Sequence, residues 1–248
     1  MNYAATIVSV APLRYEASHK SEMINQLLFG ECVIITDSTK DFFKVTCLYD
    51  GYEGWCAKNQ LAEVDENFYT TNHQKIITTS IAEATCNGQN MYLSSGSFIG
   101  CINHHQLNIG NTNFVFNNTY TSPIHLQKIM FSYINTPYLW GGKSIFGIDC
   151  SGFVQQVYKL LGIPLKRDAH QQAEQGNIVG FLQEATMGDL AFFDNEEGKI
   201  IHVGILLNES EIIHASGQVR KDKIDNAGII HTETQKRTHN LRIIKRML

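Results

Sequence analysis

The pattern of apolar residues changes once along the chain, near Tyr120, and this change constrains the fold more than any other feature. Before it, short runs rich in Val, Ile, Thr and aromatic residues alternate with polar turns such as Asp50-Gly51, which is typical of β-strands. After it, apolar residues recur at helical spacing in HLQKIMFSYIN and CSGFVQQVYKLLG, and strand-like runs return from Gly188 onward. The order of two helices followed by an antiparallel sheet predicts an α+β domain.

The chain divides into three predicted parts. Residues 1–64 contain the runs CVIITDS, FFKVTCLY and GWCAKNQL and favour a small barrel of about five strands, with helical spacing only in the short segment 21–28. Residues 65–120 repeat this character less clearly and predict a second small β-barrel. Residues 121–248 form the predicted α+β domain, whose first helix is expected to start at Ser122-Pro123.

The composition excludes several classes of protein. The chain carries 20 Lys+Arg and 24 Asp+Glu, and this net charge of −4 argues against a general nucleic-acid binder. No stretch approaches the ~18 apolar residues of a membrane span, so no membrane partner is expected. The opening residues do not read as a signal peptide, which predicts a cytoplasmic protein with reduced thiols.

Cys150 is the cysteine whose position points to chemistry. Six cysteines without a CxxC pair are too sparse for a disulfide scaffold or a zinc knuckle. Cys150 follows Asp149 and opens a predicted helix that runs to about Leu161. The unpaired N–H groups and the helix dipole there favour a thiolate and can stabilise an oxyanion. We therefore interpret Cys150 as a nucleophile and the remaining cysteines as structural: Cys32, Cys47, Cys56, Cys86 and Cys101.

Two histidines are the candidate partners of this cysteine. His202 and His214 lie in strand-like runs on either side of a polar loop around Asn208. A hairpin centred on Asn208 places the two imidazoles opposite each other on one face, so that one can act as a base and the other can orient it. A zinc site formed by Cys150, His202 and His214 is the alternative, but an Asp-Cys-Ser-Gly sequence at a helix start fits a nucleophile better. We expect no metal or cofactor.

These motifs occur in an order that resembles a known family. The blocks TPYLWGGKSIFGIDCSGFVQQVYKLLGIPLKRDAHQQAEQG, GDLAFF, IHVGILL and IIHASG resemble the NlpC/P60 cysteine peptidases over residues 136–217. The segments SEMINQLLFGE and DGYEGW resemble the bacterial SH3 (SH3b) domain of the γ-D-glutamyl-L-diamino acid endopeptidase branch. The resemblance implies a papain-like α+β catalytic domain preceded by two small SH3-like β-barrels.

The resemblance also implies an activity and a site. The family cleaves peptidoglycan peptides, and this branch cleaves the amide bond between γ-D-Glu and a diamino acid in free stem peptides with an N-terminal L-Ala. It implies Cys150 as nucleophile, His202 as base and His214 as orienting residue, with Asp149 pairing with the substrate amine. Ala169 stands where the family has Ser, which puts one substrate hydrogen bond in doubt. The implied substrate-binding residues are Tyr138, Trp140, Asp149, Ser151, Arg167 and Asp168, with Glu22 and Tyr52 from the SH3b domain.

Structural interpretations of these residues stay open, as do other functions. Asp149 and Asp168 can be helix caps, Tyr138 and Trp140 can pack a loop, and Glu22 can be a solvated charge. A cell-wall peptide-binding SH3b protein without catalysis is one alternative function, and an amidase or acyltransferase on the same scaffold is another. The intact cysteine and histidines favour the peptidase. A cytoplasmic peptidase of this kind would act in the recycling of murein peptides.

Overall fold

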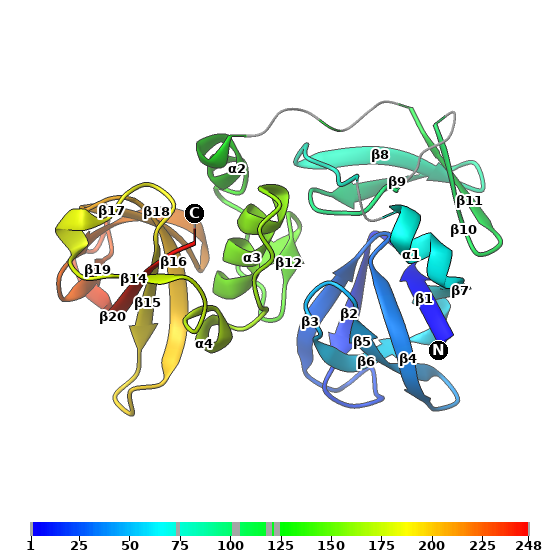
Figure 1. The fold of residues 1–248 in the computed structure, drawn as a ribbon, viewed down its shortest axis with the longest axis horizontal. Coiled ribbons are helices and arrows are strands. Elements are labelled where there is room, and N and C mark those ends of the chain that lie inside the picture. Colours follow the sequence, from blue (N-terminus) through cyan, green and yellow to red (C-terminus); the bar gives the residue numbers. More distant parts are fainter. Residues whose placement is uncertain (1, 73–74, 101–104, 118–120, 122–124, 248) are drawn as a thin grey trace. The chain divides into compact units, whose positions relative to one another are not determined.

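The computed structural model describes residues 2–72, 75–100, 105–117, 121 and 125–247. It contains two compact units (Figure 1). Unit one comprises Met1–Ile124 with Trp140–Phe146, and unit two comprises His125–Leu139 with Gly147–Leu248. In the sequence, the segment Trp140–Phe146 of unit one therefore interrupts unit two, directly before the predicted nucleophile.

The first sheet of unit one is antiparallel and has the described strand order β3-β2-β6-β5-β4-β1-β7. Its strands are β1 (Asn2–Thr6), β2 (Val10–Arg14), β3 (Met23–Leu28), β4 (Cys32–Ser38), β5 (Phe42–Cys47), β6 (Glu53–Ala57) and β7 (Leu61–Val64), with the 3-10 turn η1 (Lys58–Gln60) before β7. The helical spacing of 21–28 was misleading, because β3 pairs with β2 as a strand. Residues 25–28 are all buried, so their spacing does not mark a single face.

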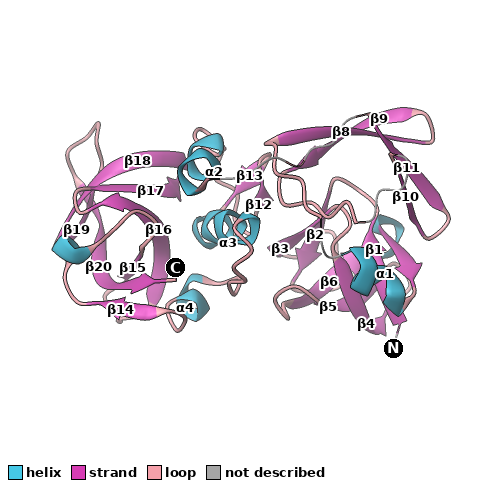
Figure 2. Ribbon diagram, turned by 45° about the horizontal axis from the view of Figure 1, so that its top comes forward, coloured by secondary structure: helices cyan, strands magenta, loops and turns pink. Residues whose placement is uncertain are grey.

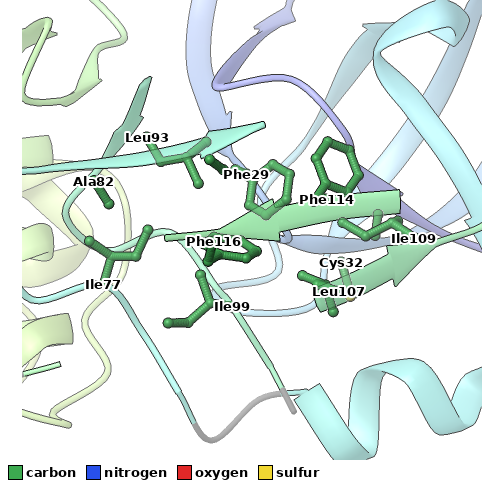
Figure 3. Packing of buried hydrophobic residues seen from close by; sticks show 12 residues of the cluster. Phe29, Cys32, Ile77, Ala82, Leu93, Ile99, Leu107, Ile109, Phe114 and Phe116 are labelled. Carbon is green, nitrogen blue, oxygen red and sulfur yellow. The ribbon is translucent and has the colours of Figure 1, made fainter. Parts of the chain in front are cut away.

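The second sheet of unit one has the described order β10-β11-β8-β9. Its elements follow the helix α1 (Glu66–Asn72) and are β8 (Ile81–Cys86), β9 (Gln89–Ser94), β10 (Gln106–Ile109) and β11 (Thr112–Phe116). Its buried face shares a core with the first sheet, since Phe29 of the first sheet's region packs edge-on against Phe114 and Phe116 (Figure 3). The second barrel predicted over 65–120 therefore differs from the described strands, which form an open sheet. Strands this few and short bury their apolar face against a neighbouring sheet more readily than they close on themselves.

The sheet of unit two is antiparallel, with the described order β14-β20-β15-β16-β17-β18-β19, and β19 also pairs with β20. The strands from β20 through β15 to β19 thus close into a barrel (Figure 2). The strands are β14 (Asn177–Val179), β15 (Leu190–Asp194), β16 (Ile200–Asn208), β17 (Glu211–Ser216), β18 (Gln218–Asp225), β19 (Gly228–Ile230) and β20 (Arg237–Arg246). The other elements are α2 (Leu126–Ser132), β12 (Lys143–Ser144), β13 (Gly147–Ile148), α3 (Cys150–Leu160), α4 (Ala169–Gln172) and η2 (Leu182–Glu184), of which β12 belongs to unit one.

The helix α3 positions the predicted nucleophile Cys150 as its first residue. α3 starts at Cys150 as predicted, and its first turn is capped by Asp149, whose Oδ1 accepts a hydrogen bond from the Gly152 N–H at 2.7 Å. α3 packs on β16 and β17, and all of its residues are buried. The start predicted for the preceding helix, Ser122-Pro123, lies outside the described residues. Within the described part of the chain, no helix has the length and apolar character needed to cross a membrane.

Candidate active site

Cys150 lies at the junction of α3 and β16. Its side chain is buried, and backbone hydrogen bonds from Ser151 and Val203 reach its thiol. Val203 follows His202 in β16, so the packing of α3 on this strand brings Cys150 beside the predicted base. The remaining described cysteines are free thiols of unit one, and Cys101 lies outside the described residues.

His202 and His214 form a hydrogen-bonded pair. Nε2 of His202 lies 2.8 Å from Nδ1 of His214, and both side chains are buried. The predicted register of the hairpin was wrong by two residues, because His214 pairs with Gly204 and not with His202. The chain turns at residues 209–210 and not at Asn208. The offset between the histidines is still even, so both imidazoles remain on one face of the sheet.

Gly204 makes room for this pair. A Cβ atom at position 204 would lie 2.8 Å from Cβ of His214 and 2.8 Å from Cδ1 of Ile212. A contact of that length would force the His214 strand or side chain to move. Glycine at 204 therefore permits the diagonal reach of His214 toward His202 across the strand pair.

The hydrogen-bonded chain continues beyond the predicted residues to Asp222 in β18. Nε2 of His214 lies 3.1 Å from Oδ2 of Asp222, whose side chain is 1% exposed. Arg220 contacts both oxygens of Asp222, with Nε 2.9 Å from Oδ2 and Nη2 3.2 Å from Oδ1. The Thr232 N–H donates to Oδ1 at 2.8 Å. The sequence carried a signal for this extension, since a hairpin centred on Gly217 places Arg220 opposite His214.

A third histidine packs on the predicted base. The ring of His239 in β20 stacks on His202 with centroids 4.1 Å apart and an interplanar angle of 23°. Phe193 in β15 contacts both rings. The sequence offered no partner for His239, because the pairing of β20 with β15 joins segments far apart in the chain. These contacts hold the imidazole of His202 between rings on the sheet.

The electrostatic environment keeps the cysteine and its base neutral. Burial and the charge of Asp149 raise the pKa of Cys150 to about 12, and the opposing backbone hydrogen bonds and Arg167 do not offset this rise. Burial, followed by repulsion from His214 and His239, lowers the pKa of His202 well below its ordinary value. The thiolate expected from the helix start is therefore not the resting form. The helix N–H groups act in the predicted direction, but burial outweighs them.

Asp149 and Ser151 are joined by a buried arginine. Arg167 is 1% exposed and donates to both carboxylate oxygens of Asp149, at 3.0 Å and 2.6 Å. It also donates to Oγ of Ser151 at 3.0 Å. The two residues flanking Cys150 are thus fixed by one guanidinium, and Asp149 has the capping role as well as this ion pair.

Tyr138 and the Arg167-Asp168-Ala169 segment complete the predicted residues in unit two. Tyr138 is half-buried, and burial, followed by the nearby Cys150 and Asp149, raises its pKa to about 12. Asp168 caps α4 in a capping box with Gln171. Ala169 is the first residue of α4 and has no side-chain group that can donate a hydrogen bond.

The remaining predicted residues lie in unit one. Nε1 of Trp140 donates to Oε1 of Glu22 at 2.7 Å, so the structure brings these two residues together. Trp140 is nevertheless 61% exposed, and Glu22 is exposed as well. Tyr52 packs partly buried against the core of the first sheet. Tyr52 therefore has a packing role, and Glu22 and Trp140 are exposed to solvent.

The arrangement of the described side chains does not favour the zinc alternative. Among the residues that the structure describes, no group of three or more His, Cys, Asp and Glu side chains is arranged to hold a metal ion. His202, His214 and Asp222 are instead joined to one another by hydrogen bonds.

Comparison with known proteins identifies the family. The model of the NlpC/P60 family matches residues 135–239, and that of the bacterial dipeptidyl-peptidase SH3 domain matches residues 13–61. A gamma-D-glutamyl-L-lysine dipeptidyl-peptidase from Bacillus subtilis is 30% identical over 212 residues, which cover 77% of this chain and 71% of the relative. The chain belongs to the NlpC/P60 family. Its NlpC/P60 match contains Cys150, His202 and His214, and its SH3 match contains Glu22 and Tyr52.

Two further comparisons cover nearly the whole NlpC/P60 chain. Dipeptidyl-peptidase 6 from Lysinibacillus sphaericus is 28% identical over 249 residues, which cover 86% of this chain and 87% of the relative. The crystal structure of an NlpC/P60 family protein from Bacillus cereus matches with a TM-score of 0.80 at 21% identity and covers 99% of each chain. At this identity the second match shows a shared fold.

Proposed function

We propose that this NlpC/P60 protein is a cysteine endopeptidase that hydrolyses the amide bond between γ-D-Glu and a diamino acid in free peptidoglycan stem peptides with an N-terminal L-Ala. The observation that carries the proposal is the buried pair of His202 and His214, with 2.8 Å between the imidazoles, on the strand whose Val203 backbone reaches the buried thiol of Cys150. A cysteine at a helix start beside a histidine on a sheet also supports the papain-like description. The names of the relatives from Bacillus subtilis and Lysinibacillus sphaericus support this choice of bond.

The first half of the reaction forms a thioester. His202 takes the thiol proton as Sγ of Cys150 attacks the carbonyl carbon of γ-D-Glu, because both groups are neutral at rest. N–H groups at the start of α3 stabilise the negative charge that forms on the carbonyl oxygen. The imidazolium of His202 then gives its proton to the amine of the diamino acid, the C–N bond breaks, and this amine leaves.

The second half of the reaction releases the acyl group. His202 takes a proton from water as the water oxygen attacks the thioester carbon. The carbon–sulfur bond breaks, and Cys150 regains its proton from His202. The products are L-Ala-D-Glu and a peptide or amino acid that begins with the diamino acid. His214 orients His202 in both halves of the reaction through its 2.8 Å contact.

Recognition of a free N-terminal amine forms part of the proposal. An ammonium group that leaves water requires a carboxylate or aromatic faces as partners. Asp149 offers a carboxylate next to Cys150, and Tyr138 offers a half-buried ring near both residues. The roles of Glu22, Tyr52 and Trp140 toward substrate stay predictions, as do the cytoplasmic location and the recycling role.

Defined peptides test this proposal. L-Ala-γ-D-Glu-L-Lys, the corresponding diaminopimelate peptide and their N-acetylated forms are incubated with the protein, and the products are identified by mass spectrometry. We expect L-Ala-D-Glu and the free diamino acid from the unmodified peptides and no cleavage of the acetylated ones. Equal rates on free and acetylated peptides would remove the amine requirement. Binding without turnover would favour a wall-peptide-binding protein, and transfer of the acyl group to an amine would favour an acyltransferase.

A further inference from the structure

We propose that Asp222, held by Arg220, is a positioning residue that fixes the proton positions on both active-site histidines and thereby leaves Nδ1 of His202 as the base nitrogen. Asp222 is not one of the three residues that the family resemblance implies. The assignment of protons rests on the hydrogen-bond geometry together with an ionised Asp222 and neutral imidazoles, whereas its effect on catalysis rests on the proposed peptidase function.

The carboxylate of Asp222 determines the proton position on His214. Burial opposes the charge on Asp222, but hydrogen bonds from His214, Thr232 and Arg220 hold the pKa of its carboxyl below its usual range. An ionised carboxylate only accepts hydrogen bonds. Nε2 of His214, which lies 3.1 Å from Oδ2 of Asp222, therefore carries a hydrogen.

The hydrogen on Nε2 of His214 in turn determines the proton position on His202. Burial lowers the pKa of His214, so its imidazole is neutral and carries one hydrogen, which is the one on Nε2. Its Nδ1 is then an acceptor, and the 2.8 Å contact requires a hydrogen on Nε2 of His202. His202 is neutral as well, so its Nδ1 holds a lone pair and can take the thiol proton.

Arg220 has a separate role, which is to keep His214 neutral beside the carboxylate of Asp222. A carboxylate beside His214 favours the imidazolium, which would donate from Nδ1 and force the hydrogen of a neutral His202 onto its own Nδ1. The base nitrogen would then be blocked. Arg220 contacts both oxygens of Asp222 and balances its charge. The charged or titratable groups around His214 are Asp222 and Arg220 from β18, His202 from β16, His239 from β20, and His231 after β19.

An amide cannot replace the carboxylate without conflict. Oδ2 of Asp222 faces donors on His214 and Arg220, and Oδ1 faces donors on Arg220 and Thr232. Asparagine has one oxygen and one NH₂ group, so in either orientation its NH₂ meets N–H donors. In the orientation that faces NH₂ toward His214, the proton on Nε2 is no longer favoured. Asp222→Asn is therefore a sharp probe that keeps the shape of the side chain.

The direct test is nitrogen NMR of the unmodified protein at about pH 7.5, where a protonated and an unprotonated imidazole nitrogen give distinct signals. We expect hydrogens on Nε2 of His202 and of His214 and an unprotonated Nδ1 on both rings. A hydrogen on Nδ1 of His202 would overturn the inference. This measurement does not depend on hydrolysis. If the peptides are not cleaved but the expected signals are seen, the proposed function fails and the proton assignment stands.

The kinetic test compares Asp222→Asn with Asp225→Asn. Asp225 is in the same strand and also binds an arginine, Arg237, through both oxygens, but its side chain is 46% exposed. We expect Asp222→Asn to lower kcat roughly 10- to 100-fold with little change in KM, and Asp225→Asn to leave both unchanged. The NMR signals of His202 and His214 should change only in Asp222→Asn. Unchanged kcat and unchanged imidazole signals in Asp222→Asn would contradict the positioning role.

Arg220→Gln provides a second variant that keeps the carboxylate, in case Asp222→Asn does not fold. The unbalanced charge of Asp222 should raise the pKa of His214, and the acid limb of the kcat profile should move to higher pH. An acid limb that stays in place, together with unchanged imidazole signals, would overturn the role assigned to Arg220 and Asp222.

Discussion

The neutral resting forms of Cys150 and His202 determine the expected pH dependence of catalysis. His202 has a lowered pKa, so it remains a base in more acidic solution than an ordinary histidine, whose pKa is about 6.5. The pKa of Cys150 is raised to about 12, so its thiol stays protonated through the alkaline range. We predict that kcat/KM for the tripeptide falls only below about pH 6.5. We also predict that ionisation of the thiol causes no change in kcat/KM up to about pH 9. An acid limb at or above an ordinary histidine pKa would contradict this prediction.

Some residues of the candidate site could be predicted from the sequence, and others could not. Cys150 and the two histidines could be predicted because a helix start and an even spacing are local features. Asp222 was not chosen, although it lies in a local hairpin with the strand of His214. His239 could not be chosen in the same way, because its place depends on the pairing of β20 with β15, which are far apart in the chain. The neutral state of the thiol was missed because burial is a property of the packed domain and not of the helix start.

At the level of elements, the strand pair β16–β17 depends on Gly204. We predict that Gly204→Ala lowers the free energy of unfolding by ~1–3 kcal/mol, because its Cβ would lie 2.8 Å from Cβ of His214. The displaced imidazole should also lower kcat. Urea unfolding and peptide kinetics measure the two effects.

Gly180→Ala is the matched control, since a Cβ at 180 meets only Glu184 Oε2 at 3.6 Å. Equal free energies of unfolding and equal kcat values for Gly204→Ala and Gly180→Ala would show that His214 does not need the space at position 204.

The segment Trp140–Phe146 is anchored in unit one by a buried ion pair. Nζ of Lys143 lies 2.9 Å from Oε2 of Glu31, with exposures of 1% and 3%. Lys143→Met leaves the carboxylate of Glu31 buried without its ammonium, and we predict a loss of ~3–5 kcal/mol in the free energy of unfolding of unit one. Trp55 and Trp140 both belong to unit one, so tryptophan fluorescence in urea follows this transition.

An exposed pair serves as the control for Lys143→Met. Lys199 and Glu197 are also 2.9 Å apart, but their exposures are 75% and 70%. This pair lies in unit two, and Lys199→Met should lower the free energy of unfolding of that unit, followed by circular dichroism in urea, by at most about 1 kcal/mol. Similar losses in the two variants would mean that burial does not set the strength of the Lys143–Glu31 pair.

The elements differ in how well their sequences predict them. The start of α3 was correct because Asp149 and Cys150 carry a local capping signal. Residues 23–28 of the segment 21–28 form a strand despite the helical spacing, because residues buried on both faces give the spacing no single apolar side. The strands of 65–120 were expected as a barrel, and their packing against Phe29 and Ala5 depends on tertiary contacts that no local pattern records.

At the scale of the whole molecule, the buried histidines of unit two make its stability sensitive to acid. His202, His214 and His239 all have lowered pKa values, that of His239 to about 4. Below about pH 6.5 the unfolded chain therefore binds more protons than the folded unit, so stability is lost as pH falls from about 6.5 toward about 4. We predict faster hydrogen exchange in β15 and β16 at about pH 5 than at about pH 7.5, after correction for intrinsic rates.

His239→Phe should reduce this acid sensitivity, because it removes one of the protonated groups while keeping a ring on His202. Corrected exchange in β15 and β16 that does not change with pH would contradict the neutral state of the histidines. A steeper loss of protection in His239→Phe would contradict the part assigned to His239.

The central claim is that Cys150 performs the hydrolysis of the γ-D-Glu–diamino acid bond. The most direct measurement incubates L-Ala-γ-D-Glu-L-Lys and its diaminopimelate counterpart with three proteins and identifies the products by mass spectrometry. The proteins are the unmodified protein, Cys150→Ala and the control Cys86→Ala, which replaces a partly buried cysteine of unit one. We predict L-Ala-D-Glu from the unmodified protein and from Cys86→Ala, and none from a folded Cys150→Ala. Intact peptides in every sample, or full cleavage by Cys150→Ala, would contradict the claim.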